Sequence, residues 1–410
     1  MSSHFRSVRL CGSLVLVAAP LFAAAPSHAQ AVPTRLTEAE AVSLALGDGD
    51  FARGAQARRD AARAGAEAIT RFENSSLSVS RNTLSGPVED EEEWEIGFVQ
   101  PLDLTGRRSA LRGAAVAEAE ATDADVQRRA HERRAQTRRA YVGCAVAVER
   151  AAATAGYRDR LIDAERIVTE RSAAGDTAVY DLRRVRVEAR AAEAEVRLAE
   201  GEITAECATL ARLTGTPGAI AAEPLRSPML IPSREPERPD LVARERRVEA
   251  AGYTTRAAER SRWPEVQLGV GWRRVEALGF EADGPQVSVG VTIPLFDRGS
   301  ARVREARALE HAEAADLALA RREALAEVDA AEARAVAAVE AVRIAETARD
   351  DAGRLGVTAE TAYQAGETGV TDLVDAYRAA HEAELSIIEM TGRANLAAIE
   401  LELAQGGPNP

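Results

Sequence analysis

The feature that most constrains the fold is a passage that the chain contains twice. The stretches EIGFVQPLDLTGRR (95–108) and SVGVTIPLFDRGSA (288–301) each join an alternating apolar segment to Pro-Leu and then to a glycine. Pro101 and Gly106 in the first stretch match Pro294 and Gly299 in the second, and each glycine precedes a long run rich in Ala, Arg and Glu. Each copy predicts a turn from a β-strand into a long helix.

Two further pairs of matching segments indicate that the chain is a duplication. SAAGDTAVYDL (172–182) matches YQAGETGVTDL (363–373), and SSLSVSR (75–81) matches VQLGVGW (266–272). The landmarks recur in one order at a spacing of 191 to 193 residues, which is typical of one structural unit used twice. We therefore expect a first structural repeat at 30–215, a proline-rich linker at 216–240, a second repeat at 241–405 and a flexible tail at 406–410.

The distribution of proline predicts where the helices lie. Proline is absent between Pro101 and Pro217 and between Pro294 and Pro408, whereas six prolines occur within 217–239. Because proline breaks helix interiors, each repeat is predicted to hold a long helical region. The outgoing helix of the first repeat, at about 107–173, would measure roughly 100 Å and would have to pack as a coiled-coil-like hairpin.

Each helical region is interrupted by one strong turn signal, Gly-Asp-Thr in the first repeat and Gly-Glu-Thr in the second. Gly175 and Gly366 suit the C-caps of the outgoing helices. Thr177 and Thr368 suit the N-caps of the returning helices. We therefore expect two helical hairpins, each with its tip at one of these turns.

Four segments, at about 74–82, 92–102, 265–274 and 286–295, alternate with the period of two that is typical of strands. They are apolar on one face and small or polar on the other, as in outer-membrane barrels, and Trp94, Trp263 and Trp272 lie in or beside them. Four strands cannot close into a barrel, so strands from several chains must combine, and three chains would supply twelve. The alternative is two soluble strand hairpins that pack on the helices.

Composition excludes several functional classes and suggests export. Residues 1–29 have the pattern of a secretory signal, with a cleavage point after Ala29. The formal net charge is −13 and all 52 basic residues are arginine, which argues against nucleic acid as a partner. We find no catalytic motif and no Cys/His cluster with metal-ligand spacing, so we expect neither enzymatic activity nor a cofactor.

Cys144 and Cys207 are the cysteines that follow the predicted signal, and the midpoint between them falls on the turn at Gly175. In a hairpin of two straight helices, residues equidistant from the turn lie at a similar height. An oxidising periplasm permits a disulfide between them. The interpretation that we prefer from sequence is that two small unpaired side chains share the packed seam, because a disulfide also requires a suitable helix phase.

With these features in hand, the chain resembles the TolC-like outer-membrane efflux proteins, and within them the heavy-metal (CzcC-like) branch. The segments that carry the resemblance are LTEAEAVSLAL (36–46), QPLDLTGRR (100–108), IPLFDRG (293–299) and the two glycine-centred turns. The resemblance implies a mainly α fold with a membrane β-barrel: a homotrimer whose twelve-stranded barrel crosses the outer membrane and whose antiparallel helical hairpins form an α-barrel tunnel. It also implies docking on a periplasmic adaptor and an inner-membrane pump of the RND type.

The resemblance further assigns the glycine turns to a periplasmic tip where the tunnel closes. It places Asp372 and Asp375 as rings of carboxylates at the constriction, where like charges would favour cations. It pairs Tyr363 with Asp181 on the neighbouring hairpin as a latch. The family member in which this latch is best known has arginine at the position of Thr368, so the closed state is expected to be held more weakly or by other contacts.

Together, these observations favour a passive export duct in the outer membrane, with a large periplasmic portion, for metal cations or other small solutes. One alternative is a periplasmic coiled-coil scaffold or adaptor without a membrane barrel. Another keeps the channel but changes its cargo to organic compounds or to polypeptides of type I secretion. The sequence does not distinguish between cargoes, because selectivity would normally lie in the pump and the adaptor.

Overall fold

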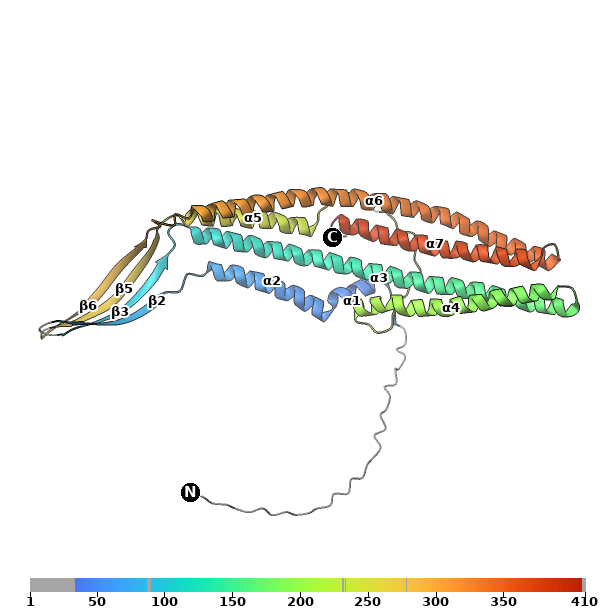
Figure 1. The fold of residues 1–410 in the computed structure, drawn as a ribbon, viewed down its shortest axis with the longest axis horizontal. Coiled ribbons are helices and arrows are strands. Elements are labelled where there is room, and N and C mark those ends of the chain that lie inside the picture. Colours follow the sequence, from blue (N-terminus) through green and yellow to red (C-terminus); the bar gives the residue numbers. More distant parts are fainter. Residues whose placement is uncertain (1–33, 87–89, 231, 233, 278, 408–410) are drawn as a thin grey trace, which may run out of the picture. The chain divides into compact units, whose positions relative to one another are not determined.

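The computed structural model describes residues 34–86, 90–230, 232, 234–277 and 279–407 (Figure 1). The predicted signal at 1–29 and the end of the predicted tail lie outside these residues. The chain divides into two units, Met1–Val32 and Pro33–Pro410, and all elements below belong to the second. The helices are α1 (Glu38–Gly47), α2 (Gly49–Thr70), α3 (Arg107–Ala174), α4 (Val179–Thr214), α5 (Pro239–Arg260), α6 (Ser300–Ala365) and α7 (Val370–Ala404). The strands are β1 (Thr34–Leu36), β2 (Ser76–Ser85), β3 (Asp90–Leu102), β4 (Ala219–Ala221), β5 (Glu265–Ala277) and β6 (Phe280–Thr292).

The four predicted strands are confirmed, with altered bounds, as one antiparallel sheet in the order β2-β3-β5-β6 (Figure 1). The strand pair β3 and β5 joins the two repeats, with Ile96 opposite Trp272. Among the described strands, β2 and β6 each have one neighbour in this sheet. The sheet therefore has two edges whose backbone groups have no strand partner within this chain.

The two faces of this sheet differ in chemistry. One face carries large apolar side chains, all exposed to solvent: Leu77, Val79, Trp94, Ile96, Phe98, Leu268, Val270, Trp272, Val287, Val289 and Val291. The other face carries small or polar residues, and Gly97 stands opposite Gly271. A Cβ atom on Gly271 would lie 2.5 Å from the carbonyl oxygen of Ile96, so no larger side chain fits there without a backbone shift.

Each predicted repeat also contains a long helical hairpin, α3 with α4 in the first and α6 with α7 in the second. The predicted outgoing helix is confirmed as α3, of 68 residues, and its counterpart α6 has 66. Most of their buried side chains are alanine or valine, which lets neighbouring helices approach closely. Helix α3 packs on α4, α5, α7 and α2, while α6 packs on α7 and α5. No helix in the described residues combines the length and the apolar character that crossing a membrane requires.

Inside the predicted linker at 216–240, the chain forms a strand that the sequence did not indicate. Ala219–Ala221 (β4) pairs in parallel with Thr34–Leu36 (β1). Both are three residues long, and Leu36 and Ala221 are buried in a cluster with Tyr141 and Leu210. The start of the described chain is thus attached to the first hairpin near the C-terminal end of α4, away from the hairpin tip.

The same cluster contains a disulfide between Cys144 on α3 and Cys207 on α4. Their Cα atoms are 4.6 Å apart, and the amide of Ala221 points to the sulfur of Cys144 at 3.3 Å. The sequence-based preference for unpaired thiols is therefore wrong. The seam is narrow enough for a disulfide because α3 and α4 meet here through small side chains such as Ala145.

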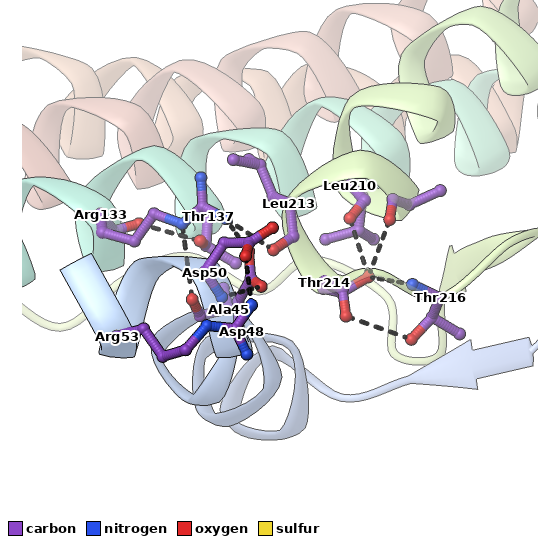
Figure 2. A network of polar contacts seen from close by, with 11 residues as sticks. Ala45, Asp48, Asp50, Arg53, Arg133, Thr137, Leu210, Leu213, Thr214 and Thr216 are labelled. Atoms are coloured by element: carbon purple, nitrogen blue, oxygen red, sulfur yellow. Dashed lines mark hydrogen bonds and ion pairs between the residues drawn. The ribbon is translucent and has the colours of Figure 1, made fainter.

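Arginines on α3 bind the C-terminal ends of other helices in this central region. Arg133 donates to the carbonyl oxygen of Leu213 at 3.0 Å, in the last turn of α4, and to that of Ala45 at 3.5 Å, in the last turn of α1. It also pairs with Asp48, between α1 and α2, at 3.5 Å (Figure 2). A cation is stabilised at these positions because the last carbonyl groups of a helix lack intrahelical partners.

Candidate functional site

The candidate site lies at the tips of the two hairpins, where α3 turns into α4 and α6 turns into α7. Gly175 and Gly366 end the outgoing helices, as predicted, with φ of 85° and 79°. These left-handed conformations favour glycine. In each turn the following residue donates its amide to a carbonyl five residues back: Asp176 to Arg171 and Glu367 to Ala362, both at 2.9 Å. The two tips thus have the same turn geometry.

The predicted capping role of the two threonines is wrong. The N-caps of the returning helices are Ala178 and Gly369, one residue beyond Thr177 and Thr368. The glycine turn uses two residues to satisfy the carbonyl groups of the outgoing helix, and this delays the start of the next helix. The hydroxyl oxygen of Thr368 is buried without a hydrogen-bond partner among the described residues.

Asp372 and Asp375 lie on exposed positions of the first turns of α7. They are three residues apart and share a helix face. The carboxylate of Asp372 accepts a hydrogen bond from the amide of Gly369 at 3.2 Å, which caps the helix. The carboxylate of Asp375 lies 3.5 Å from Arg184 of α4 and 3.6 Å from Arg378 of α7. Both carboxylates therefore have local partners in this chain.

The structure does not bring Tyr363 and Asp181 together as a latch. The hydroxyl of Tyr363 is buried and has no hydrogen-bond partner among the described residues. Its carbonyl oxygen instead accepts a hydrogen bond from Arg171 at 3.0 Å, and the Arg171 guanidinium lies over the Tyr363 ring at 4.8 Å from the centroid. Sequence reasoning missed Arg171, although a cation in the last turn of a helix is a recognised stabilising pattern.

Below the tips, a buried cluster joins the two hairpins. It contains Leu161 and Val168 of α3, Val185 of α4, Tyr363 of α6 and Leu373 of α7. All of these side chains are less than a tenth exposed. The two hairpins therefore pack on each other through a common apolar core rather than through polar contacts alone.

An aromatic pair lies in the same seam. The rings of Tyr157 on α3 and His381 on α7 are stacked, with centroids 4.6 Å apart. Burial lowers the pKa of His381 below its ordinary value. One turn closer to the tip, burial and the nearby Glu360 carboxylate raise the pKa of Tyr377 to about 12.

The duplicated strand-to-helix turns form the opposite ends of α3 and α6. Gly106 and Gly299 stand directly before the helices, with φ of 71° and 68°. Pro101 lies near the end of β3, and Pro294 follows β6. Each turn also uses an aspartate that sequence reasoning missed. Asp103 accepts from the amide of Arg108 at 2.8 Å, and Asp297 accepts from the amide of Gly299 at 2.9 Å.

These aspartates act as helix-start acceptors. The amide of Gly299 and the guanidinium of Arg302 hold the pKa of Asp297 below its ordinary value. An acidic residue just before a long helix is the signal that would have identified both of them. Within the described residues, no group of three or more His, Cys, Asp or Glu side chains is arranged to hold a metal ion.

Comparison with solved structures defines the class of this fold. The chain superposes on the CusC channel with a TM-score of 0.77 at 18% identity, covering 93% of this chain and 96% of that one. It superposes on the outer membrane protein VceC of Vibrio cholerae with a TM-score of 0.73 at 20% identity, covering 90% and 96%. The fold is that of the outer-membrane channels with long helical hairpins, as predicted.

Sequence comparison specifies the family. Residues 230–407 match the model of the outer membrane efflux proteins. Over 322 residues, 75% of each chain, the sequence is 26% identical to the cobalt-zinc-cadmium resistance protein CzcC of Cupriavidus metallidurans. These two matches confirm the predicted resemblance to the outer membrane efflux proteins, a family of transport channels. Its predicted place in the outer membrane, with a large periplasmic part, is confirmed.

Proposed function

We propose that the chain is the outer-membrane duct of a tripartite efflux system and that three copies close it. The observation that carries this proposal is the sheet with an apolar, exposed face and two open edges, β2 and β6. In lipid, an unpaired strand edge leaves amide and carbonyl groups without partners, so a stable sheet must close. Three chains would supply twelve strands, and edge β6 of one copy would pair with β2 of the next.

In this proposal the duct is passive and has no catalytic role. A periplasmic adaptor and an inner-membrane pump of the RND type would contact the tips and supply the energy. Similarity to the outer membrane efflux proteins supports this, because efflux channels of this kind belong to tripartite systems. The relative CzcC is named a cobalt-zinc-cadmium resistance protein, which makes metal cations the first cargo to test.

We further propose that Asp372 and Asp375 form rings of negative charge where the tunnel narrows. Both are exposed near the start of α7, and a threefold axis would bring three copies of each together. Arg184 and Arg378 lie 3.5–3.6 Å from Asp375 and reduce its field. Asp372 has no such cationic neighbour within salt-bridge distance in the described residues, so it is expected to dominate cation preference.

The test is ion selectivity in planar bilayers, with the purified protein. Asp372→Asn is expected to lower the permeability ratio of cations to anions clearly, because it removes one carboxylate per chain from the narrow region. Asp375→Asn should have a smaller effect. Asp176→Asn, in the exposed turn of the other hairpin, is the matched control and should leave the ratio unchanged. A ratio that is the same in all four proteins would refute the carboxylate rings.

A further inference from the structure

We propose that Arg171 is the latch residue that ties the tip of the first hairpin to the tip of the second and holds the duct shut. The inference rests on the proposed function, because it assigns a state of the tip to a state of the channel. In this latch, Arg171 contacts the ring and the backbone carbonyl of Tyr363, and the tyrosine hydroxyl takes no part.

The geometry of Arg171 spans the two hairpins. The side chain leaves the last turn of α3 and donates from Nη1 to the carbonyl oxygen of Tyr363 at 3.0 Å. From Nη2 it donates to the carbonyl oxygen of Gln364 at 2.8 Å. The guanidinium also lies 4.8 Å from the centroid of the Tyr363 ring, which is 4% exposed. One side chain therefore makes three contacts with the end of α6.

The acceptors are well suited to a guanidinium. Tyr363 and Gln364 are among the last four residues of α6, whose carbonyl groups carry the negative end of the helix dipole. The carbonyl oxygen of Tyr363 also accepts the amide of Gly366 at 3.1 Å, so Arg171 is its second donor. Two parallel donors reach two successive carbonyls, which is a geometry that arginine provides and lysine does not. The cation also stacks on an aromatic face.

The other polar contacts across this seam are weaker or lie further from the tip. Arg184 approaches Asp375 at 3.5 Å, but that carboxylate is 55% exposed, and an exposed pair contributes little. Arg378 donates to Glu188 at 2.7 Å, more than a turn below the start of α7. Separation of the two tips would thus break the Arg171 contacts first.

Planar-bilayer recordings of purified wild type and variants test the latch. Arg171→Met removes all three contacts and should raise the open probability at least about tenfold. Arg171→Lys keeps the charge but loses the two-pronged bond, so an intermediate value is expected. Arg183→Met, an exposed arginine on α4 near the same tip, is the matched control and should behave as wild type.

Tyr363→Phe separates this latch from one based on the tyrosine hydroxyl. It keeps the ring and the carbonyl, so we expect wild-type opening. Opening in Tyr363→Phe as large as that in Arg171→Met, or wild-type behaviour of Arg171→Met, would overturn the proposal. Unfolding temperature is recorded for each variant, and Arg171→Lys serves if Arg171→Met does not fold.

A second measurement separates failure of the latch from failure of the proposed function. Spin labels placed on Asp176→Cys and Glu367→Cys, one on each tip, report the distance between the tips in detergent without any channel activity. Arg171→Met should broaden this distance distribution relative to wild type and to Arg183→Met. If the wild type showed no channel but this broadening occurred, the proposed duct would be wrong and the contact would stand. An unchanged distribution would overturn the latch.

Discussion

Arg133 contacts the last turns of α1 and α4 at once and lies beside Asp48, between α1 and α2 (Figure 2). Arg128 likewise contacts the last turn of α7, where it donates to the carbonyl oxygen of Leu403 at 3.2 Å. Arg171 repeats the pattern at the tip, on the last turn of α6. In a chain whose 52 basic residues are all arginine, a fork of several donors is available wherever helix ends meet.

Replacement of Arg133 should therefore lower the stability of the fold. Arg133→Met removes charge-assisted bonds to buried carbonyl groups and is expected to reduce the free energy of unfolding by about 2 kcal/mol. Arg53→Met removes an exposed pair with Asp50, three residues away on α2 (Figure 2). This variant should change the free energy of unfolding by less than about 0.5 kcal/mol. Denaturant unfolding of the two variants checks this. Equal losses would contradict the role given to Arg133.

His381 should make stability depend on pH. Its pKa is lowered chiefly by burial against Tyr157, while Glu195 of α4 and Glu382 and Glu384 of α7 raise it and Arg160 of α3 lowers it. Because the unfolded chain binds this proton more readily than the folded chain, neutral His381 contributes its full stabilisation when the pH is above the ordinary pKa of histidine. It is lost as the pH falls through the lowered pKa of the folded state.

The matching experiment compares unfolding temperatures between about pH 7.5 and about pH 5.5. His381→Phe keeps a stacked ring and removes the titration, so its unfolding temperature should fall less on acidification than that of wild type. His311→Gln, on an exposed position of α6, should keep the wild-type dependence. Parallel curves for wild type and His381→Phe would contradict this role of His381.

At the scale of elements, the disulfide fixes α3 against α4 at the level of Tyr141 and Leu210. A thiol assay on denatured, unreduced mature protein should detect no reactive thiol. Replacement of both Cys144 and Cys207 by alanine should reduce the free energy of unfolding by about 2–4 kcal/mol, since the crosslink closes a long loop. Two reactive thiols, or an unchanged stability, would show that the bond does not form in the mature protein.

The long elements were predictable from the sequence, and the short ones were not. Helices α3 and α6 have no proline for more than 60 residues, and β3 alternates through Trp94, Ile96 and Phe98. Strands β1 and β4 have three residues each and pair across nearly half of the chain, so no local pattern indicates them.

At the candidate site too, features that depend on one residue were predictable from the sequence, and features that depend on distant residues were not. Gly175 and Gly366 were identified because the C-cap depends on the backbone of one residue. The cap after each turn was misplaced by one residue, since its position depends on how the turn closes. Arg171 was missed because its acceptors lie about 190 residues away in the sequence.

At the scale of the whole molecule, the central claim is that the four strands of one chain are part of a larger closed sheet. The apolar face and the open edges β2 and β6 both require partners outside this chain. The two hairpins then continue from the sheet through the turns at Gly106 and Gly299.

The most direct test is the protein mass of the species extracted from outer-membrane fractions in mild detergent, measured by light scattering with correction for bound detergent. We predict the mass of three mature chains, which would provide twelve strands for closure. A monomer recovered from the soluble periplasmic fraction would contradict the shared barrel and would leave the sheet as a pair of ordinary hairpins on a helical scaffold.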